Sequence, residues 1–232
     1  MPPVSQKRVT LSRWQLELLT KCPRCFWLLN RHGVKQPKSL PLALNTAMDQ
    51  LLKEEFDEYR AAGEPHPILT EHGVPAKLFG DAQQLQAWRN NFQGLRWSDA
   101  GTGHTLFGAV DEILEFPDGS LAVMDYKSSG ASAATIYPSY QLQMDVYTFL
   151  LQRMGFRTAP RAYVAFFLAV KSDRFNGRLP FRAELVEVIP QPERVHALFE
   201  RAVAVAQADE VPAPGAECDL CRWHAEAQAC TA

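Results

Sequence analysis

One stretch, residues 108–127, restricts the fold more than any other part of this 232-residue chain. Its sequence, GAVDEILEFPDGSLAVMDYK, joins two apolar runs through a Pro-Asp-Gly turn at 117–119, which predicts a β-hairpin. Two carboxylates, Asp111 and Asp125, and one amine, Lys127, interrupt the apolar runs. Burying charged groups is costly unless a partner compensates them. The stretch therefore predicts that these side chains share a site, and a divalent cation is the natural partner.

The length of the hairpin loop decides whether the two carboxylates meet. Side chains alternate between the two faces of a strand, so Asp125 and Lys127 point the same way. A two-residue loop would pair residue 111 with residue 126 and place Asp111 on the opposite face. A three-residue loop, with Gly119 in the left-handed conformation, pairs residue 111 with residue 125 and brings the carboxylates together. The turn residues allow both loops, and a cation site requires the longer one because a one-residue step exchanges the faces.

A buried ion pair between Lys127 and one aspartate is the structural alternative to a cation site. Two acids for one lysine leave a negative charge uncompensated, and an unpaired buried charge is strongly unfavourable. This imbalance favours the cation site.

The composition is that of an ordinary globular protein, with 47% hydrophobic and 22% charged residues. Its length predicts one domain or two, and because no repeat or linker divides the chain, we expect residues 1–232 to form a single domain. No run approaches the roughly 18 apolar residues of a membrane span, and the first ten residues lack a signal-peptide core, so we expect a cytoplasmic protein. The net charge of −2 means that any nucleic-acid contact needs a local basic surface.

Hydrophobic periodicity predicts an α/β fold with a central mixed sheet flanked by helices. Helical spacing predicts helices within 10–30 (divided at Pro23) and at 42–60, 81–93, 138–154 and 191–208. Strand patterns occur in the hairpin at 105–127 and at 161–170 and 182–189. The run at 161–170 is almost continuously apolar, which is typical of a central strand that is covered on both faces.

Short motifs follow one another along the chain. They are GAVD at 108–111, DYK at 125–127 and QMDVY at 143–147, preceded by Cys-Pro-Arg at 22–24 and followed by three late cysteines. No single motif is specific, but the ordered series over residues 10–230 resembles the PD-(D/E)XK nuclease superfamily. The closest resemblance is to the RecB-like branch, which includes CRISPR-associated exonucleases with cysteine-bound clusters.

This resemblance implies a restriction-endonuclease-like core and a role for each motif. Asp111 and Asp125, together with the backbone carbonyl of Tyr126, would bind Mg²⁺ or Mn²⁺, which prefer oxygen ligands. Lys127 would orient or activate the attacking water and stabilise charge at the phosphate. From the third motif, the glutamine and tyrosine would face the site and position the phosphate or nucleotide. These two residues are Gln143 and Tyr147, which share one face of the predicted helix.

The implied activity is metal-dependent hydrolysis of DNA phosphodiester bonds, exonucleolytic on single-stranded ends. The implied partners are DNA and, as candidates, helicase, DNA-repair or CRISPR proteins. Two alternatives stay open. One is a catalytically inactive nuclease fold that binds DNA or a protein and has a structural Fe–S or zinc site. The other is an iron–sulfur or redox protein without nuclease activity.

The chain departs from the family at the helix before the hairpin. Members of the family usually carry a histidine there, in a G-x-x-x-H-like pattern, and residues 45–49 (NTAMD) occupy that place. Asp49 is a candidate oxygen ligand in place of the histidine. A solvated acid beside the apolar face of the helix is the alternative interpretation.

Five cysteines lie near the two ends of the chain, and this pattern in a cytosolic protein favours metal or cluster ligation over disulfides. One ligand set is Cys22, Cys218, Cys221 and Cys230, one early and three late, as in the [4Fe–4S] members of the family. The other set has Cys25 in place of Cys230 and forms a CxxC…CxxC pair that equally suits Zn²⁺. We favour the cluster, and the fourth ligand stays open between the two sets.

Two basic segments are candidates for contacts with the DNA backbone, because phosphate neutralisation dominates such affinity. One contains Lys171, Arg174 and Arg178, and the other is the loop at 31–38. Ordinary solvated surface is the alternative for each of these residues.

Overall fold

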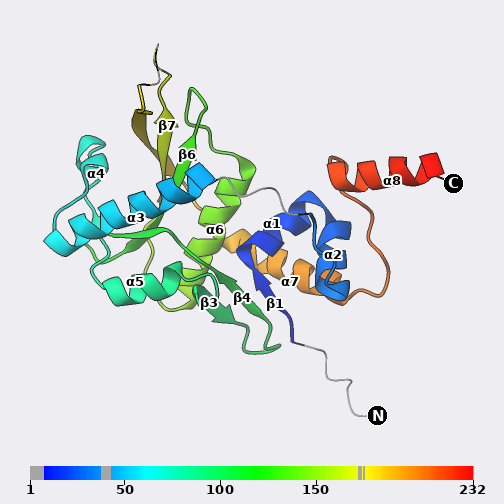
Figure 1. The fold of residues 1–232 in the computed structure, drawn as a ribbon. Coiled ribbons are helices and arrows are strands. Elements are labelled where there is room, and N and C mark those ends of the chain that lie inside the picture. The colour runs from blue at the N-terminus through cyan, green and yellow to red at the C-terminus, as the bar shows by residue number, and fades with distance from the viewer. Residues whose placement is uncertain (1–7, 38–42, 172–173, 175, 232) are drawn as a thin grey trace. The chain divides into compact units, whose positions relative to one another are not determined.

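The computed structural model describes residues 8–37, 43–171, 174 and 176–231 (Figure 1). The chain forms two compact units. The terminal unit comprises Met1–Leu40, Trp97–Phe107 and Glu193–Ala232, and the central unit comprises Pro41–Arg96 and Gly108–Pro192.

The central unit contains a five-stranded mixed sheet in the order β2-β5-β6-β7-β8. Its strands are β2 (Lys77–Leu78), β5 (Glu112–Glu115), β6 (Leu121–Ser129), β7 (Ala162–Ala169) and β8 (Phe181–Val188). β6 and β7 run parallel, and the other neighbours are antiparallel. Six of the eight residues of β7 are buried, as the apolar run predicts for a central strand. The predicted α/β class with a mixed sheet is confirmed.

The hairpin of β5 and β6 has the three-residue loop. Phe116 donates its backbone N–H to the carbonyl of Ser120 at 2.9 Å, and Gly119 has a φ of 77°, in the left-handed region. The register pairs Glu112 with Met124 and Glu115 with Leu121, and its continuation aligns residue 111 with residue 125. The register that brings the two carboxylates to one face is therefore confirmed.

Helices of the central unit pack on this sheet. They are α3 (Ala43–Ala62), α4 (Pro67–Glu71), α5 (Ala82–Arg89) and α6 (Pro138–Arg153). Phe56 of α3 is fully buried in a core cluster with Met124 and Ala165 of the sheet. α5 ends four residues earlier than the predicted helix, because the side chain of Asn90 accepts hydrogen bonds from the backbone of the next turn and closes the helix.

The terminal unit is mainly helical. Its helices are α1 (Arg13–Lys21), α2 (Pro23–His32), α7 (Glu193–Gln207) and α8 (Asp219–Thr231). Ser12 and Gln15 form a capping box that starts α1, and Pro23 begins α2, so the predicted division at this proline is confirmed. α1 and α2 pack against α7. None of the described helices has the length and hydropathy needed to cross a membrane.

A second sheet, which the sequence patterns do not predict, has three short strands in the order β1-β4-β3. They are β1 (Thr10–Ser12), β4 (Thr105–Gly108) and β3 (Leu95–Ser98), and β1 pairs with β4 in parallel. The sequence patterns assigned residues 105–108 to the hairpin, whereas β4 pairs in this second sheet. β1 and β3 are too short for alternation to be recognised, so only the tertiary pairing reveals them.

Candidate functional site

The hairpin places Asp111, Asp125 and Lys127 together. Asp111 and Asp125 share a side-chain hydrogen bond, and Lys127 donates a hydrogen bond to Oδ2 of Asp125. Asp125 is 1% exposed, whereas the side chains of Asp111 and Lys127 are 21% and 22% exposed. The site therefore has a buried carboxylate at its base and a second carboxylate and an amine that reach the surface.

The two carboxylates have opposite pKa shifts. Burial raises the pKa of Asp125 to about 7, and the negative charge of Asp111 adds to this effect. Burial alone would raise the pKa of Asp111 as well, but the charge of Lys53 and the hydrogen bond with Asp125 outweigh it and lower that pKa. Two carboxylates in one site cannot both ionise cheaply, so Asp111 is the ionised member and Asp125 holds the proton longer.

The glutamine of the third motif, on α6, supports the buried carboxylate. Nε2 of Gln143 donates to Oδ1 of Asp125 at 2.6 Å and lies 3.4 Å from Oη of Tyr147. Both residues are buried, so the two motif side chains form a chain of hydrogen bonds that ends on Asp125. Tyr140 lies one turn earlier on α6, and its ring centroid is 5.1 Å from Nζ of Lys127. Its position at i−3 from Gln143 is the sequence signal that could have revealed it.

Lys53 is a further charged residue at the site that the sequence patterns did not single out. Its Nζ lies 3.1 Å from Oδ1 of Asp111 and 2.8 Å from Oδ2 of Asp49. Burial lowers the pKa of Lys53, but the two aspartates, chiefly Asp111, outweigh burial and raise it. The predicted ligand Asp49 is thus connected to Asp111 through the lysine one helical turn after it. The i, i+4 spacing on α3 was the available signal.

Glu112, the neighbour of Asp111, points to the opposite face and belongs to the support of the site. Its carboxylate is fully buried and accepts hydrogen bonds from Arg60, from Arg89 at 3.2 Å and from Oη of Tyr126 at 3.1 Å. Because side chains alternate along a strand, Asp111 reaches the surface whereas Glu112 lies in a buried ion-pair network. The side chain of Tyr126 contributes to this network.

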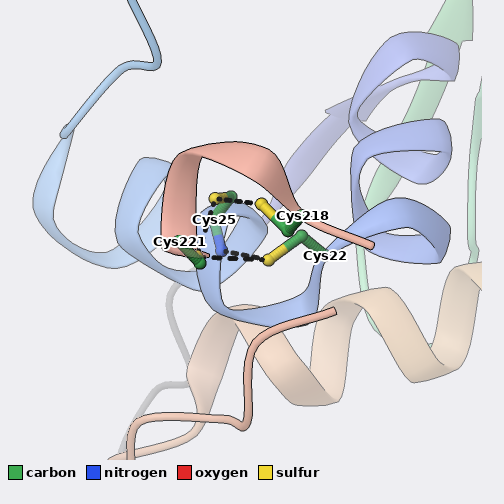
Figure 2. Close-up of side chains that lie close together, drawn as sticks. All are labelled: Cys22, Cys25, Cys218 and Cys221. Carbon is green, nitrogen blue, oxygen red and sulfur yellow. Dashed lines mark hydrogen bonds between the residues drawn. The ribbon is translucent and has the colours of Figure 1, made fainter. Parts of the chain in front are cut away.

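Four thiols form a second cluster, within the terminal unit (Figure 2). They are Cys22, Cys25, Cys218 and Cys221, and their Sγ atoms lie within 4.8 Å of one another. Burial raises the pKa of the Cys22 thiol, but the backbone N–H groups of Gly215 and Cys25 outweigh burial and lower it to about 7. Burial raises the pKa of Cys25 to about 11. The early and late parts of the chain thus meet at the predicted cysteine site.

Of the two sets that the sequence left open, the one with Cys25 is the set whose four thiols lie together, and Cys230 is not among them. Cys230 is exposed near the end of α8, whereas Cys221 is in the first turn of the same helix. Nine residues of helix separate the two thiols by about 13 Å along the axis, so they cannot bind one small centre. The helical conformation of α8 therefore excludes the set with Cys230.

The comparison with family models decides the classification. The model described as PD-(D/E)XK nuclease superfamily matches residues 10–226, nearly the whole chain. The chain belongs to the PD-(D/E)XK nuclease superfamily. This membership supports a nuclease-type function and a nucleic-acid substrate.

Further comparisons add little to the superfamily assignment. No curated protein matches the chain significantly. Seven chains of solved structures match, among them one described as "Crystal structure of SSO0001", which is 13% identical. That match covers 95% of this chain and 86% of the other, with a TM-score of 0.45. A likeness at this level supports no inference about function.

The nuclease fold usually needs a divalent metal, and the carboxylate pair suits one. Asp111 and Asp125 supply hard oxygen donors on one face of the hairpin, and the two negative charges so close together would be offset by a cation. The four thiols are soft donors and suit a metal or cluster of a different kind. The chain thus contains two separate sets of side chains whose chemistry suits a metal.

The predicted basic segments differ in their surroundings. Lys171 is exposed and, with Arg182, lines a cavity of about 390 Å³ at the ends of β6 and β7. Arg178 is also exposed, as is Arg174, which has an interaction partner. The predicted loop at 31–38 begins later than expected, because Arg31 and His32 form the end of α2. Arg31 forms an ion pair with Asp209 at 2.6 Å, and Lys38 lies outside the described residues.

Proposed function

We propose that this chain is a metal-dependent deoxyribonuclease of the RecB-like branch that degrades DNA from single-stranded ends. One observation carries the proposal. Asp111, Asp125 and Lys127 lie together on one hairpin face in a chain that belongs to a nuclease superfamily. A scaffold that needed only stability would gain little from two acids and one amine gathered at the surface end of a buried strand.

In this proposal the carboxylates bind the metal, and the amine acts on the water and the phosphate. Asp111 and Asp125, with the carbonyl of Tyr126, would hold Mg²⁺ or Mn²⁺, which would polarise the scissile phosphate and offset the charge that develops on its oxygens. Lys127 projects from the same face and reaches solvent, so its ammonium is suited to orient the attacking water and to donate to a phosphate oxygen. The face of Tyr140 holds this ammonium in position.

Gln143 is a positioning residue in this proposal. Its amide fixes the orientation of the Asp125 carboxylate, and Tyr147 is hydrogen-bonded to that amide from the next turn of α6. Because these side chains are buried and held by packing, the carboxylate needs little rearrangement when substrate binds.

The cavity at the ends of β6 and β7 is suited to a neighbouring phosphate. Its lining begins at Gly130, three residues after Lys127, which corresponds to about 10 Å along the strand. Lys171 and Arg182 bring positive charge to this cavity. A single strand that crosses the site could therefore place one phosphate at the carboxylates and another at the cavity.

One observation favours the second candidate function, a catalytically inactive nuclease fold that binds DNA or a protein. Lys53, one helical turn after the place where the family usually has a histidine, forms an ion pair with Asp111. An ammonium that stays on Asp111 would compete with a cation for the same oxygen. The experiment below separates the two functions.

We would prepare the full chain anaerobically and incubate it with Mn²⁺ and single-stranded DNA labelled at the 5′ or the 3′ end. Wild type should degrade linear strands and spare a closed circular strand, since an exonuclease needs an end. Lys127→Ala should lower the rate about 100-fold or more. The matched control is Lys77→Ala, an exposed lysine of the edge strand β2, which should keep the wild-type rate.

Equal rates for wild type and Lys127→Ala would identify the activity as a contaminant and remove the enzyme proposal. DNA binding without any Mn²⁺-dependent cleavage would instead favour the inactive binding module. Comparison of the two labels then determines the polarity of an active enzyme.

A further inference from the structure

We propose that Cys22, Cys25, Cys218 and Cys221 form a tetrahedral four-thiolate site for a single zinc ion, in place of the [4Fe–4S] cluster that the family resemblance implies. The site lies within the terminal unit, and the proposal holds whether or not the chain is an active nuclease. Its role is to attach the C-terminal helix to α2.

The distances between sulfur atoms distinguish a single ion from a cluster. Sγ of Cys25 lies 3.6 Å from that of Cys221 and 3.7 Å from that of Cys218, and the Cys22 and Cys221 sulfurs are 3.7 Å apart. Four sulfurs at about 2.3 Å from one tetrahedral zinc ion are about 3.8 Å from one another. In a [4Fe–4S] cluster each thiolate binds a different iron, which spreads the sulfurs to on the order of 6 Å. All four sulfurs lie within 4.8 Å of one another, which is closer to the spacing around one ion than to that of a cluster.

Both halves of the site have the same local design (Figure 2). Cys22 is the N-cap of α2 and Cys25 its third residue, while Cys218 directly precedes α8 and Cys221 is the third residue of that helix. Each CxxC pair therefore lies at a helix N-terminus, where backbone N–H groups and the helix dipole stabilise the negative charge of thiolates. Two such pairs facing each other supply the four soft donors of a structural zinc site.

Gly215, in the segment before α8, contacts Cys22 directly. Its N–H donates to Sγ of Cys22 at 3.3 Å, the kind of outer contact that stabilises a metal-bound thiolate. A Cβ at position 215 would lie 2.0 Å from the carbonyl oxygen of Lys21 and 3.1 Å from Cα of Cys22. Both obstacles are backbone atoms, so only glycine allows this close approach.

α8 has little packing of its own against the part of the chain that the structure describes. None of its side chains is buried, and the exposed ones include Trp223 at 66%. A helix without a buried apolar face has little packing energy to hold it in place. The thiols at its first turn are therefore the features that would fix it, provided that a metal joins them to α2.

The first test measures the metal content of the full chain purified anaerobically from cells supplied with both zinc and iron. We expect one zinc per chain and no visible absorption from an iron–sulfur cluster. A cluster with its sulfide would overturn the proposal, and so would a chain whose four thiols hold no metal. A single iron per chain would retain the tetrahedral geometry but overturn zinc as the occupant.

The second test uses a matched pair of cysteine variants. Cys25→Ser should weaken zinc retention at least tenfold against a competing chelator, whereas Cys230→Ser should bind as wild type does. The reverse order would overturn the ligand set. Cys25→His provides a rescue, since imidazole is also a zinc ligand, and should retain zinc better than Cys25→Ser. Gly215→Ala keeps all four thiols and should also lower retention, because its Cβ would displace the backbone that positions Cys22.

The third test measures the structural role by limited proteolysis. Metal removal should expose the segment between α7 and α8, residues 208–218, to cleavage, and zinc should restore protection in wild type and in Cys230→Ser. Protection that is the same with and without metal would overturn the role in holding α8.

Discussion

Asp125 is the residue whose protonation state most affects the candidate site. Its carboxyl is nearly inaccessible, next to a second carboxylate and hydrogen-bonded by an amine and an amide. Burial and the neighbouring charge of Asp111 raise its pKa to about 7. Near neutral pH a proton on Asp125 would therefore compete with a metal cation for this carboxylate.

This pKa leads to a prediction about pH and stability. The folded state binds the proton more tightly than the unfolded state, so its stabilising effect is complete below the ordinary aspartate pKa and is lost as pH rises through about 7. In buffer without added Mg²⁺ or Mn²⁺, wild type should lose more Tm between pH 5 and pH 8 than Asp125→Asn, by about 3 °C or more. The buffer should contain no chelator, which would also affect the cysteine site. Parallel curves for the two proteins would contradict the shift.

At the scale of elements, the β5–β6 hairpin places charged side chains on both faces of the sheet. Its three-residue loop directs Asp111 to the site, and alternation then sends Glu112 into a fully buried network with two arginines. Arg60 comes from α3 and Arg89 from α5, so this one carboxylate connects both helices to the strand. The network holds in place the strand that carries the site.

Loss of this carboxylate should be costly. Glu112→Ala would leave two buried guanidinium groups to share one partly exposed carboxylate, that of Asp57, and we expect the lost buried partner to cost about 3–5 kcal/mol. Thermal unfolding should show a Tm lower by on the order of 10 °C. The control is Glu115→Ala on the same strand, whose partner Lys77 is mostly exposed and whose loss should cost less than about 1 kcal/mol. Similar losses for the two variants would show that the buried network adds nothing.

At the scale of the whole molecule, charge limits how the chain can bind DNA. The net charge is −2, so affinity depends on local basic groups. Lys171 and Arg178, which follow β7, are exposed and suited to phosphate contacts, whereas Arg31 is already paired with Asp209. DNA binding should therefore depend more on the segment after β7 than on the loop after α2.

The salt dependence of DNA affinity tests whether the basic residues after β7 contact the DNA backbone. In a Lys127→Ala background without Mn²⁺, so that DNA stays intact, replacement of Lys171 and Arg178 by alanine should weaken binding of single strands equally across sequences. The slope of log affinity against log salt should become shallower by about 0.7 for each lost contact. Lys77→Ala in the same background should leave the slope unchanged. An unchanged slope in the double variant would remove this segment from the proposed binding surface.

Much of the local structure could be predicted from the sequence. Helix boundaries at Ser12 and Pro23 follow from caps and proline geometry, and the Pro-Asp-Gly turn indicated the hairpin. The residues of the three motifs lie together as the pattern predicted, and their catalytic roles remain predictions. These features depend on residues that are close together in the chain, so they can be read from the sequence.

Tertiary structure decided the rest. The choice of Cys25 over Cys230 depends on the helical conformation of α8, and the contact of Lys53 with Asp111 depends on how α3 packs on the sheet. The three-stranded sheet joins segments that are too short to show a period. The cysteine cluster, the Lys53–Asp111 ion pair and the second sheet all join residues that are far apart in the chain. Packing sets the distances between such residues, and local conformational preferences do not.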